Sequence, residues 1–234
     1  MAFYGEVTGA SVHIVHVSSA LGASRIALAR GRGVDITGET CPQYLVLTDA
    51  VYEETEGHLY SASPALRKDR DRAALWKALR IGGIDFVATD HCPFTREQKT
   101  WTGDFADLPY GIAGVETSLP LVYSFGVGAG LLPLETLPVV MSQAPADRYA
   151  LPGKGRILPG YDADLVLFDP QARWSLSASK FHMNVDFCPY EGMEVRGRVV
   201  STFSRGEEIY CDGELCCEPG RGRYLFRAPR PKVR

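Results

Sequence analysis

The sequence contains no apolar run of the roughly 20 residues that a membrane-spanning helix needs. Its first ten residues, MAFYGEVTGA, lack the basic and apolar regions of a secretory signal peptide. The formal net charge of −3 over 234 residues provides no general attraction for nucleic acid or for an anionic membrane. We therefore expect a cytoplasmic, globular protein of one or two domains, with neither a nucleic acid nor a membrane as partner.

Cysteine motifs are also missing. The six cysteines show no paired C-x-x-C spacing, so neither a structural zinc site nor a redox pair is indicated. We expect all six to be reduced thiols; they are Cys41, Cys92, Cys188, Cys211, Cys216 and Cys217.

Three short segments rich in β-branched residues are typical of buried strands: 12–18 (VHIVHVS), 34–42 (VDITGETCP) and 85–90 (DFVATD). Two segments between them have apolar residues near helical spacing and end in glycines, at 19–33 and 68–84. The apolar positions are Leu21, Ile26, Leu28 and Ala29 in the first helix and Leu75, Trp76 and Leu79 in the second. Alternation of strand and helix predicts an α/β fold with parallel strands.

The pattern changes further along the chain. Residues 116–130 and 134–151 look helical with Pro and Gly interruptions, and short strands are expected at 164–169, 194–206 and 207–214. We predict a domain change near residue 155. Three or four parallel strands do not close an eightfold barrel, which needs roughly 250 residues. If residues 1–155 belong to such a barrel, they form part of one, and residues 156–234 form a β-rich segment with a tail.

Two residues that could carry chemistry follow predicted parallel strands. His16 and Asp90 each lie at a carboxyl end, where parallel α/β folds place their reacting groups. His13 lies three residues before His16, an odd offset that points it to the opposite face of the strand. By residue type alone, a strand histidine is more often a core residue and an aspartate that ends a strand is more often a cap.

A series of motifs favours the chemical interpretation. IVHVSS, GETCPQYLVL, SPALR, ATDHCPF, GIAGVETSLPL, GKGRILPGYDADLVLFDP and GRGRYLFR occur in this order over essentially the whole chain. They resemble the second half of the hydantoinase and dihydropyrimidinase branch of the cyclic amidohydrolases. The resemblance implies the last three or so βα units of a metal-dependent TIM barrel, followed by part of a composite β-sandwich.

The resemblance also implies roles for four residues. His16 matches a metal-binding histidine at the end of the sixth barrel strand, and Asp90 a metal-binding aspartate at the end of the eighth. Asp90 would also be the general base, taking a proton from the metal-bridging hydroxide and passing it to the leaving nitrogen. Ser63 matches a serine that hydrogen-bonds the cyclic imide. Tyr110 stands where the family usually has Asn, at a position that contacts substrate mainly through its backbone, so its loop geometry is in question.

The implied cofactor is a pair of divalent metal ions, with zinc as the first expectation, since two metals activate water and polarise a carbonyl. The family's His-x-His pair, carboxylated lysine and further histidine on earlier strands have no counterpart here. Two ligands are fewer than the three or four that a catalytic metal usually takes. We therefore expect a truncated chain that begins just before the sixth strand and is inactive alone, with His91 and Cys92 in supporting or packing roles.

Three alternatives stay open. An allantoinase or dihydroorotase is the near competitor, against which Gln43 speaks because those enzymes typically have His there. A non-catalytic assembly protein of the same fold is the second, and a degraded gene without function is the third. For the parent protein we expect a small cyclic amide as substrate and a homodimer or homotetramer. Tyr224, Leu225 and Phe226 would let the basic C-terminal tail pack on another subunit.

Overall fold

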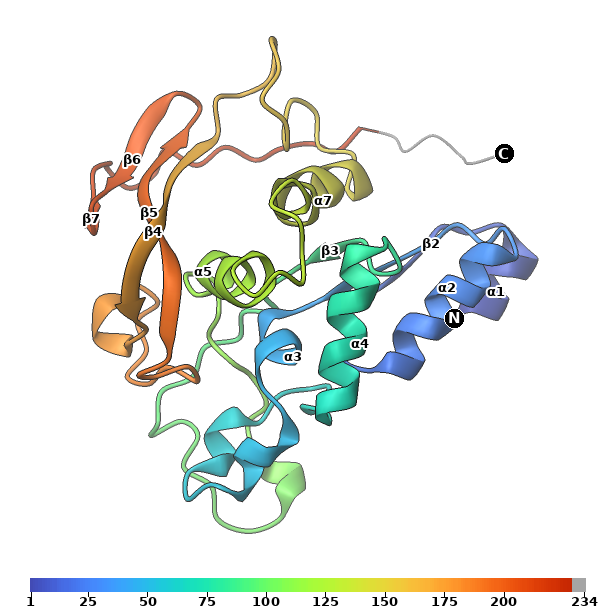
Figure 1. Cartoon of the computed structure of the whole chain (residues 1–234), viewed down its shortest axis with the longest axis horizontal. Helices are drawn as coiled ribbons and strands as arrows, with labels where there is room; N and C mark the ends of the chain where they lie inside the picture. The colour runs from blue at the N-terminus through green and yellow to red at the C-terminus, as the bar shows by residue number, and fades with distance from the viewer. Residues whose placement is uncertain (229–234) are drawn as a thin grey trace.

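The structure, a computed structural model, describes residues 1–228. Within this range, a parallel sheet with the order β1-β2-β3 and an antiparallel sheet with the order β4-β5-β6-β7 lie on opposite sides of a layer of helices (Figure 1). None of the helices in this part of the chain is long and apolar enough to cross a membrane.

The elements follow one another as strand and helix first and as strands only later. The parallel sheet consists of β1 (Val12–Ile14), β2 (Ile36–Thr40) and β3 (Phe86–Val87), and the antiparallel sheet of β4 (Leu165–Ser175), β5 (Glu194–Ser204), β6 (Glu207–Cys211) and β7 (Glu214–Leu215). The α-helices are α1 (Ala2–Thr8), α2 (Ala20–Gly31), α3 (Pro42–Val46), α4 (Asp69–Arg80), α5 (Ser118–Val122), α6 (Thr136–Pro138) and α7 (Ala144–Arg148). Short 3-10 helices are η1 (Asp49–Glu53), η2 (Gly57–Tyr60), η3 (Phe105–Asp107) and η6 (Ala178–Lys180), and π-helical turns are η4 (Tyr123–Val127) and η5 (Val139–Gln143).

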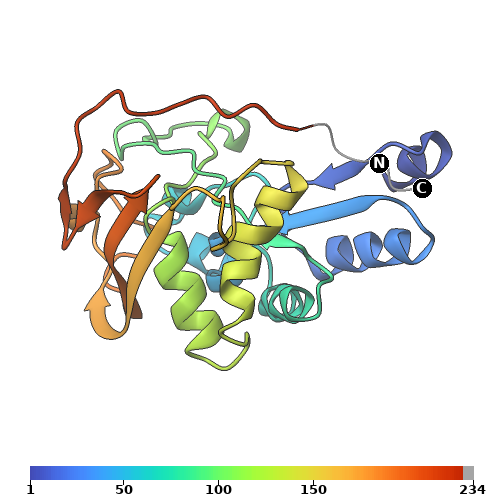
Figure 2. The same cartoon turned by 90° about the horizontal axis from the view of Figure 1, so that it is seen from above.

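The parallel βα arrangement predicted from the sequence is confirmed. Val12 pairs with Ile36 in the β1–β2 register, and Thr40 pairs with Val87 in the β2–β3 register. The helices α2 and α4 contact each other and cover one face of the sheet (Figure 2). A Cβ atom added at Gly38 of β2 would lie 2.6 Å from Cδ1 of Ile26, so residues 36, 38 and 40 face these helices.

The strands are shorter than predicted. Regular pairing ends at Ile14 in β1 and at Val87 in β3, whereas the sequence pattern indicated strands to residues 18 and 90. The backbone leaves the strand conformation because His16 and Asp90 adopt positive φ values of 39° and 49°. Both residues therefore belong to the loops that follow the strands.

One of the two predicted helix faces was wrong in part. In α4, Leu75, Trp76 and Leu79 are buried together as predicted. In α2 the buried residues are Ala23, Ile26 and Ala29, while Leu21 and Leu28 are 64% and 55% exposed. The spacing of 23, 26 and 29 follows the helical repeat more closely, and small alanines let α2 approach the sheet.

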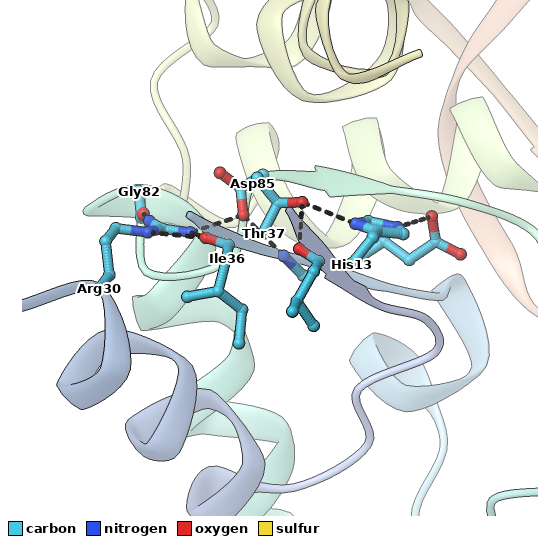
Figure 3. A network of polar contacts seen from close by, with 9 residues as sticks. His13, Arg30, Ile36, Thr37, Gly82 and Asp85 are labelled. Carbon is cyan, nitrogen blue, oxygen red and sulfur yellow. Dashed lines mark hydrogen bonds and ion pairs between the residues drawn. The ribbon is translucent and has the colours of Figure 1, made fainter. Parts of the chain in front are cut away.

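A polar network joins α2 to the amino-terminal ends of β2 and β3 (Figure 3). The guanidinium of Arg30 donates to the carbonyls of Ile36 and Gly82 and to Oδ2 of Asp85 at 2.8 Å. The same carboxylate accepts the backbone N–H of Gly38 at 2.8 Å. Because this arginine binds both β2 and the loop before β3, it helps to fix the register of the two strands.

The helical segments predicted at 116–130 and 134–151 contain α5 with η4 and α6 with η5 and α7. The strand predicted at 164–169 is longer, since β4 continues through Pro170 to Ser175. The pairing with β5 is irregular between Asp169 and Arg173. Such an irregularity accommodates a proline, which cannot donate to the ladder.

The antiparallel sheet packs directly on the helical layer. The rings of Tyr123 and Phe168 meet edge to face with centroids 4.8 Å apart. Ser124 Oγ accepts the backbone N–H of Arg196 at 3.0 Å. Gly197 lies between these partners with a φ of 91°, and a Cβ atom there would come within 2.4 Å of Phe168 and 2.6 Å of Tyr123. A single core cluster therefore includes residues of both the parallel α/β part and the β-rich part of the chain.

We predict that Gly197→Ala lowers the free energy of unfolding by about 1–3 kcal/mol more than Gly213→Ala, measured by urea denaturation. Both glycines have positive φ, at 91° and 103°, so both variants carry the left-handed strain of about 1–2 kcal/mol. Nothing lies within 4 Å of a Cβ at Gly213, so only Gly197→Ala adds a steric clash. Equal losses in the two variants would show that the packing at Gly197 contributes nothing.

Candidate active site

The carboxyl ends of the three parallel strands place three loops at one edge of the sheet. His16 lies two residues after β1, Cys41 directly after β2, and Asp90 three residues after β3. Parallel strands put their carboxyl ends on the same side, which is where this fold class binds ligands. Sequence reasoning placed His16 and Asp90 at this edge, and the topology agrees with that placement.

His16 and Asp90 share an uncommon backbone conformation. Their φ values of 39° and 49° lie in the left-handed region, which costs a residue with a side chain about 1–2 kcal/mol. Within residues 1–228, neither side chain makes a hydrogen bond or an ion pair to the protein, so these contacts do not offset the strain. Strained residues of this kind cluster at functional sites.

The charge of Asp90 acts on the loop that follows β2. Burial raises the pKa of the Cys41 thiol, and the negative charges of Asp90 and then Glu39 raise it further. Burial also raises the pKa of the Tyr44 hydroxyl, with smaller contributions from Cys41 and Asp90. Cys41 and Tyr44 therefore form a buried surface near Asp90 on which a further negative charge is unfavourable.

His13 has a structural role on the opposite face of the sheet from α2. Its Nδ1 lies 2.8 Å from Oγ1 of Thr37 (Figure 3), and its Nε2 lies 2.9 Å from Oε2 of Glu39. Its ring stacks on that of Phe86. The face argument from the His13–His16 offset does not apply, because β1 ends at Ile14 and its alternation does not reach His16.

Ser63 and Tyr110 lie on two loops that touch. The exposed Ser63 follows η2, and the amide of Gly111, next to Tyr110, donates to the carbonyl of Ser61 at 2.9 Å. The Tyr110 hydroxyl donates to the Phe105 carbonyl at 2.8 Å and is thus directed into its own loop.

His91 and Cys92 contact the loop that contains Tyr110. Nδ1 of His91 accepts the amides of Gly114 at 3.0 Å and Val115 at 3.4 Å. The Cys92 amide donates to the Ile112 carbonyl at 3.1 Å. Both residues therefore position backbone in this structure, in line with the supporting role predicted for them.

Sequence reasoning missed Lys99. Its side chain is fully buried, and Nζ donates to the carbonyl of Leu59 at 2.9 Å and to the carbonyl and hydroxyl of Ser61 at 3.1 and 2.9 Å. Burial lowers the pKa of the Lys99 ammonium to about 8, an effect that Cys92 partly opposes. The lysine occurs in a polar run, TREQKTW, which by pattern alone is typical of a solvated loop.

The donor types of His16 and Asp90, an imidazole and a carboxylate, suit zinc and similar divalent ions. Among residues 1–228, however, no group of three or more His, Cys, Asp or Glu could hold a metal. The residues present therefore fit part of a metal site and do not complete one.

Comparison with known proteins decides the family. The model of the amidohydrolase family matches residues 1–209. The chain belongs to the amidohydrolase family. It is 41% identical over 223 residues to a D-phenylhydantoinase of Escherichia coli, a match that covers 94% of this chain and 48% of the relative.

Two solved structures confirm the resemblance to the hydantoinase and dihydropyrimidinase branch of the amidohydrolases. A dihydropyrimidinase from Brevibacillus agri superposes with a TM-score of 0.95 at 38% identity, covering 98% of this chain and 51% of that one. A D-hydantoinase (dihydropyrimidinase) from Thermus sp. gives a TM-score of 0.95 at 37% identity, with the same coverage. The chain spans about half the length of the relatives it matches.

Thiol accessibility tests the packing beside Asp90. All six cysteines are free; Cys92 and Cys216 are exposed, and Cys41 and Cys188 are buried. We predict that iodoacetamide modifies Cys92 and Cys216 in the native chain and leaves Cys41 and Cys188 unmodified, as read by peptide mass spectrometry. Burial acts twice, since it blocks access and raises the pKa of both buried thiols, that of Cys188 to about 11.

Modification of the urea-unfolded chain is the control, in which all six thiols should react. If Cys41 reacted as fast as Cys92 in the native chain, the surface below Asp90 would be open to solvent and the geometry of the site would be wrong.

Proposed function

We propose that this chain carries part of the active site of a hydrolase that opens the ring amide of hydantoins or 5,6-dihydropyrimidines. The observation that carries the proposal is the pair His16 and Asp90. Both follow strands of one parallel sheet at its carboxyl edge, β1 and β3, which flank β2, and both have left-handed backbones. Within residues 1–228 neither side chain makes a hydrogen bond to the protein. The names of the relatives, D-phenylhydantoinase and dihydropyrimidinase, point to the same chemistry.

In this proposal β1, β2 and β3 are the sixth to eighth strands of the barrel. His16 and Asp90 are then two ligands of a centre with two divalent metal ions, for which zinc is our first choice. Such metals, when bound, polarise the ring carbonyl and activate water. The remaining ligands would come from strands that precede this segment in the parent enzyme.

Asp90 is the proposed general base. A carboxylate at the centre can take a proton from the attacking water and return it to the ring nitrogen as the amide bond breaks. The exposure of Asp90 leaves its oxygens accessible from the sheet edge. Ser63 and the backbone of Tyr110 would hold the cyclic imide, and both lie on the loops that meet at Ser61.

The near alternative is an allantoinase or dihydroorotase. Gln43, at 2% exposure, lies in α3, which follows β2 after Cys41. A buried glutamine there does not offer the imidazole that those enzymes typically have at this position. We therefore keep the hydantoinase and dihydropyrimidinase assignment, with a small cyclic amide as substrate.

The parent protein is proposed to be a cytoplasmic homo-oligomer. The tail runs along the surface from the antiparallel sheet to the other side of the molecule, where the amide of Ala228 donates to the carbonyl of Ala150 (Figure 2). Tyr224 and Phe226 are 82% and 79% exposed, and their rings pack edge to face. These aromatic side chains would bury apolar area against a second subunit.

We predict that the 234-residue chain alone opens neither hydantoin nor dihydrouracil, with or without added zinc or manganese. Two ligands do not hold a catalytic metal in water. The assay measures ring opening as the loss of ring absorbance in the ultraviolet. Turnover by the purified chain would show that it builds a complete site by itself, for example in an oligomer.

We further predict that roughly 700 bases of source DNA upstream of Met1 contain an open frame with a His-x-His pair and, later, a lysine and a histidine at strand ends. The longer protein should open one of the two rings. A longer protein that binds metal and leaves both rings intact would contradict the proposed function, and a stop codon would make His16 and Asp90 remnants of a lost site.

In that longer protein, Asp90→Asn should lower kcat by about 10²–10⁴-fold, because the general base is lost. His16→Asn should lower the bound metal content, measured by atomic emission. His182→Asn is the matched control, since His182 pairs with Glu116 and lies between η6 and β5, not at the end of a parallel strand. Full activity of Asp90→Asn would exclude this aspartate as the base.

A further inference from the structure

Lys99 lies at a junction of three loops. Its ammonium group has three protons and three oxygen acceptors within 3.1 Å, all of them on Leu59 and Ser61. The ring centroids of Phe94 and Phe187 lie 5.9 and 6.0 Å from Nζ, which adds cation–π contacts. A lysine is almost never fully buried unless its charge is matched in this way.

Ser61 connects Lys99 to the Tyr110 loop. Its hydroxyl accepts from Lys99 and donates to the carbonyl of Pro109 at 2.7 Å. Its carbonyl accepts both from Lys99 and from the amide of Gly111 at 2.9 Å. The two residues that flank Tyr110 are therefore both bound to Ser61.

The loop that contains Lys99 is itself held at its other end. The amide of Arg96 donates to Oδ1 of Asp186 at 2.8 Å, and the Arg96 guanidinium pairs with Glu56 and lies 5.8 Å from the Phe187 ring. The loop that contains Lys99 is thus held in part by Asp186 and Phe187 of the β-rich part of the chain. The close packing continues at Gly111, where a Cβ atom would lie 2.6 Å from the Cys92 carbonyl.

We propose that Lys99 is a positioning residue that, through Ser61, sets the spacing between Ser63 and the backbone of Tyr110, the two groups assigned to the cyclic imide. Ser63 is two residues after Ser61, and Tyr110 lies between the two residues that Ser61 binds. Lys99 does not touch substrate in this arrangement. The inference rests on the proposed function for its meaning, while its structural basis can be measured without any activity.

The test is hydrogen exchange of the 234-residue chain, resolved by NMR or fragmentation mass spectrometry. The Gly111 amide is the reporter, because its acceptor is the Ser61 carbonyl. Lys99→Met should speed its exchange at least about tenfold, since two charge-assisted bonds to carbonyls are lost. The amides of α2 and α4 should keep their rates. Lys77→Met, at an exposed lysine of α4, is the matched control and should change neither region.

Ser61→Ala provides a second, milder variant that keeps the lysine. It should speed exchange at Gly111 by a smaller factor, and the double variant should exchange no faster than Lys99→Met alone, because both residues act in one chain of hydrogen bonds. Unchanged exchange at Gly111 in both single variants would overturn the proposal. Faster exchange by the same factor everywhere would do so too, because it would reduce Lys99 to a general contributor to stability.

In the longer, active protein the same substitution separates binding from chemistry. Lys99→Met should raise KM for the cyclic amide about tenfold and leave kcat within about threefold, since Ser63 and Tyr110 hold the ring and Asp90 moves the proton. A fall in kcat at constant KM would contradict a positioning role. If the longer protein has no activity, the proposed function fails, and the exchange data still decide whether Lys99 holds the two loops.

Discussion

The parallel pairing of β1, β2 and β3 is the constraint on which the candidate site depends. The register places Val12 beside Ile36 and Thr40 beside Val87, so that the chain leaves all three strands at the same edge. Loops that are separated by more than 70 residues in sequence, at His16 and Asp90, thereby share one edge of the sheet. Arg30 and Asp85 support this arrangement from the helix side by binding backbone groups of β2 and of the loop before β3.

Near that edge, apolar contacts support the loops and polar contacts connect the loops to one another. The apolar cluster reaches from α2 and α4 to Tyr190 and Val195 of the β-rich part, and it gives the loops a rigid base. Polar contacts complement this cluster, since Lys99 and Ser61 join the Ser63 loop to the Tyr110 loop. A rigid base with hydrogen-bonded loops is the arrangement that holds binding groups in place without using the reacting residues for support. Among residues 1–228, the side chains of His16 and Asp90 make none of these supporting hydrogen bonds.

Residues 1–228 contain several of the groups that the proposed site requires. Two side chains suited to a divalent metal, a proposed base and two proposed substrate contacts occur in one segment, while the count of ligands among the described residues stops short of a metal centre. The similarity to hydantoinases and dihydropyrimidinases covers nearly all of this chain and about half of each relative. Family membership and catalytic competence are therefore separate properties here, and only the first follows from the match.

The sequence by itself determined the order of strands and helices, the buried face of α4 and the family, because hydrophobic periodicity and short motifs are local properties of the chain. It placed His16 and Asp90 at strand ends for the same reason. Only the tertiary structure decided that both strands stop early, that α2 buries Ala23 and leaves Leu21 and Leu28 exposed, and that His13 pairs with Glu39. It also decided the burial of Lys99, whose acceptors are about 40 residues away in the chain, and no local pattern records contacts made over such a separation.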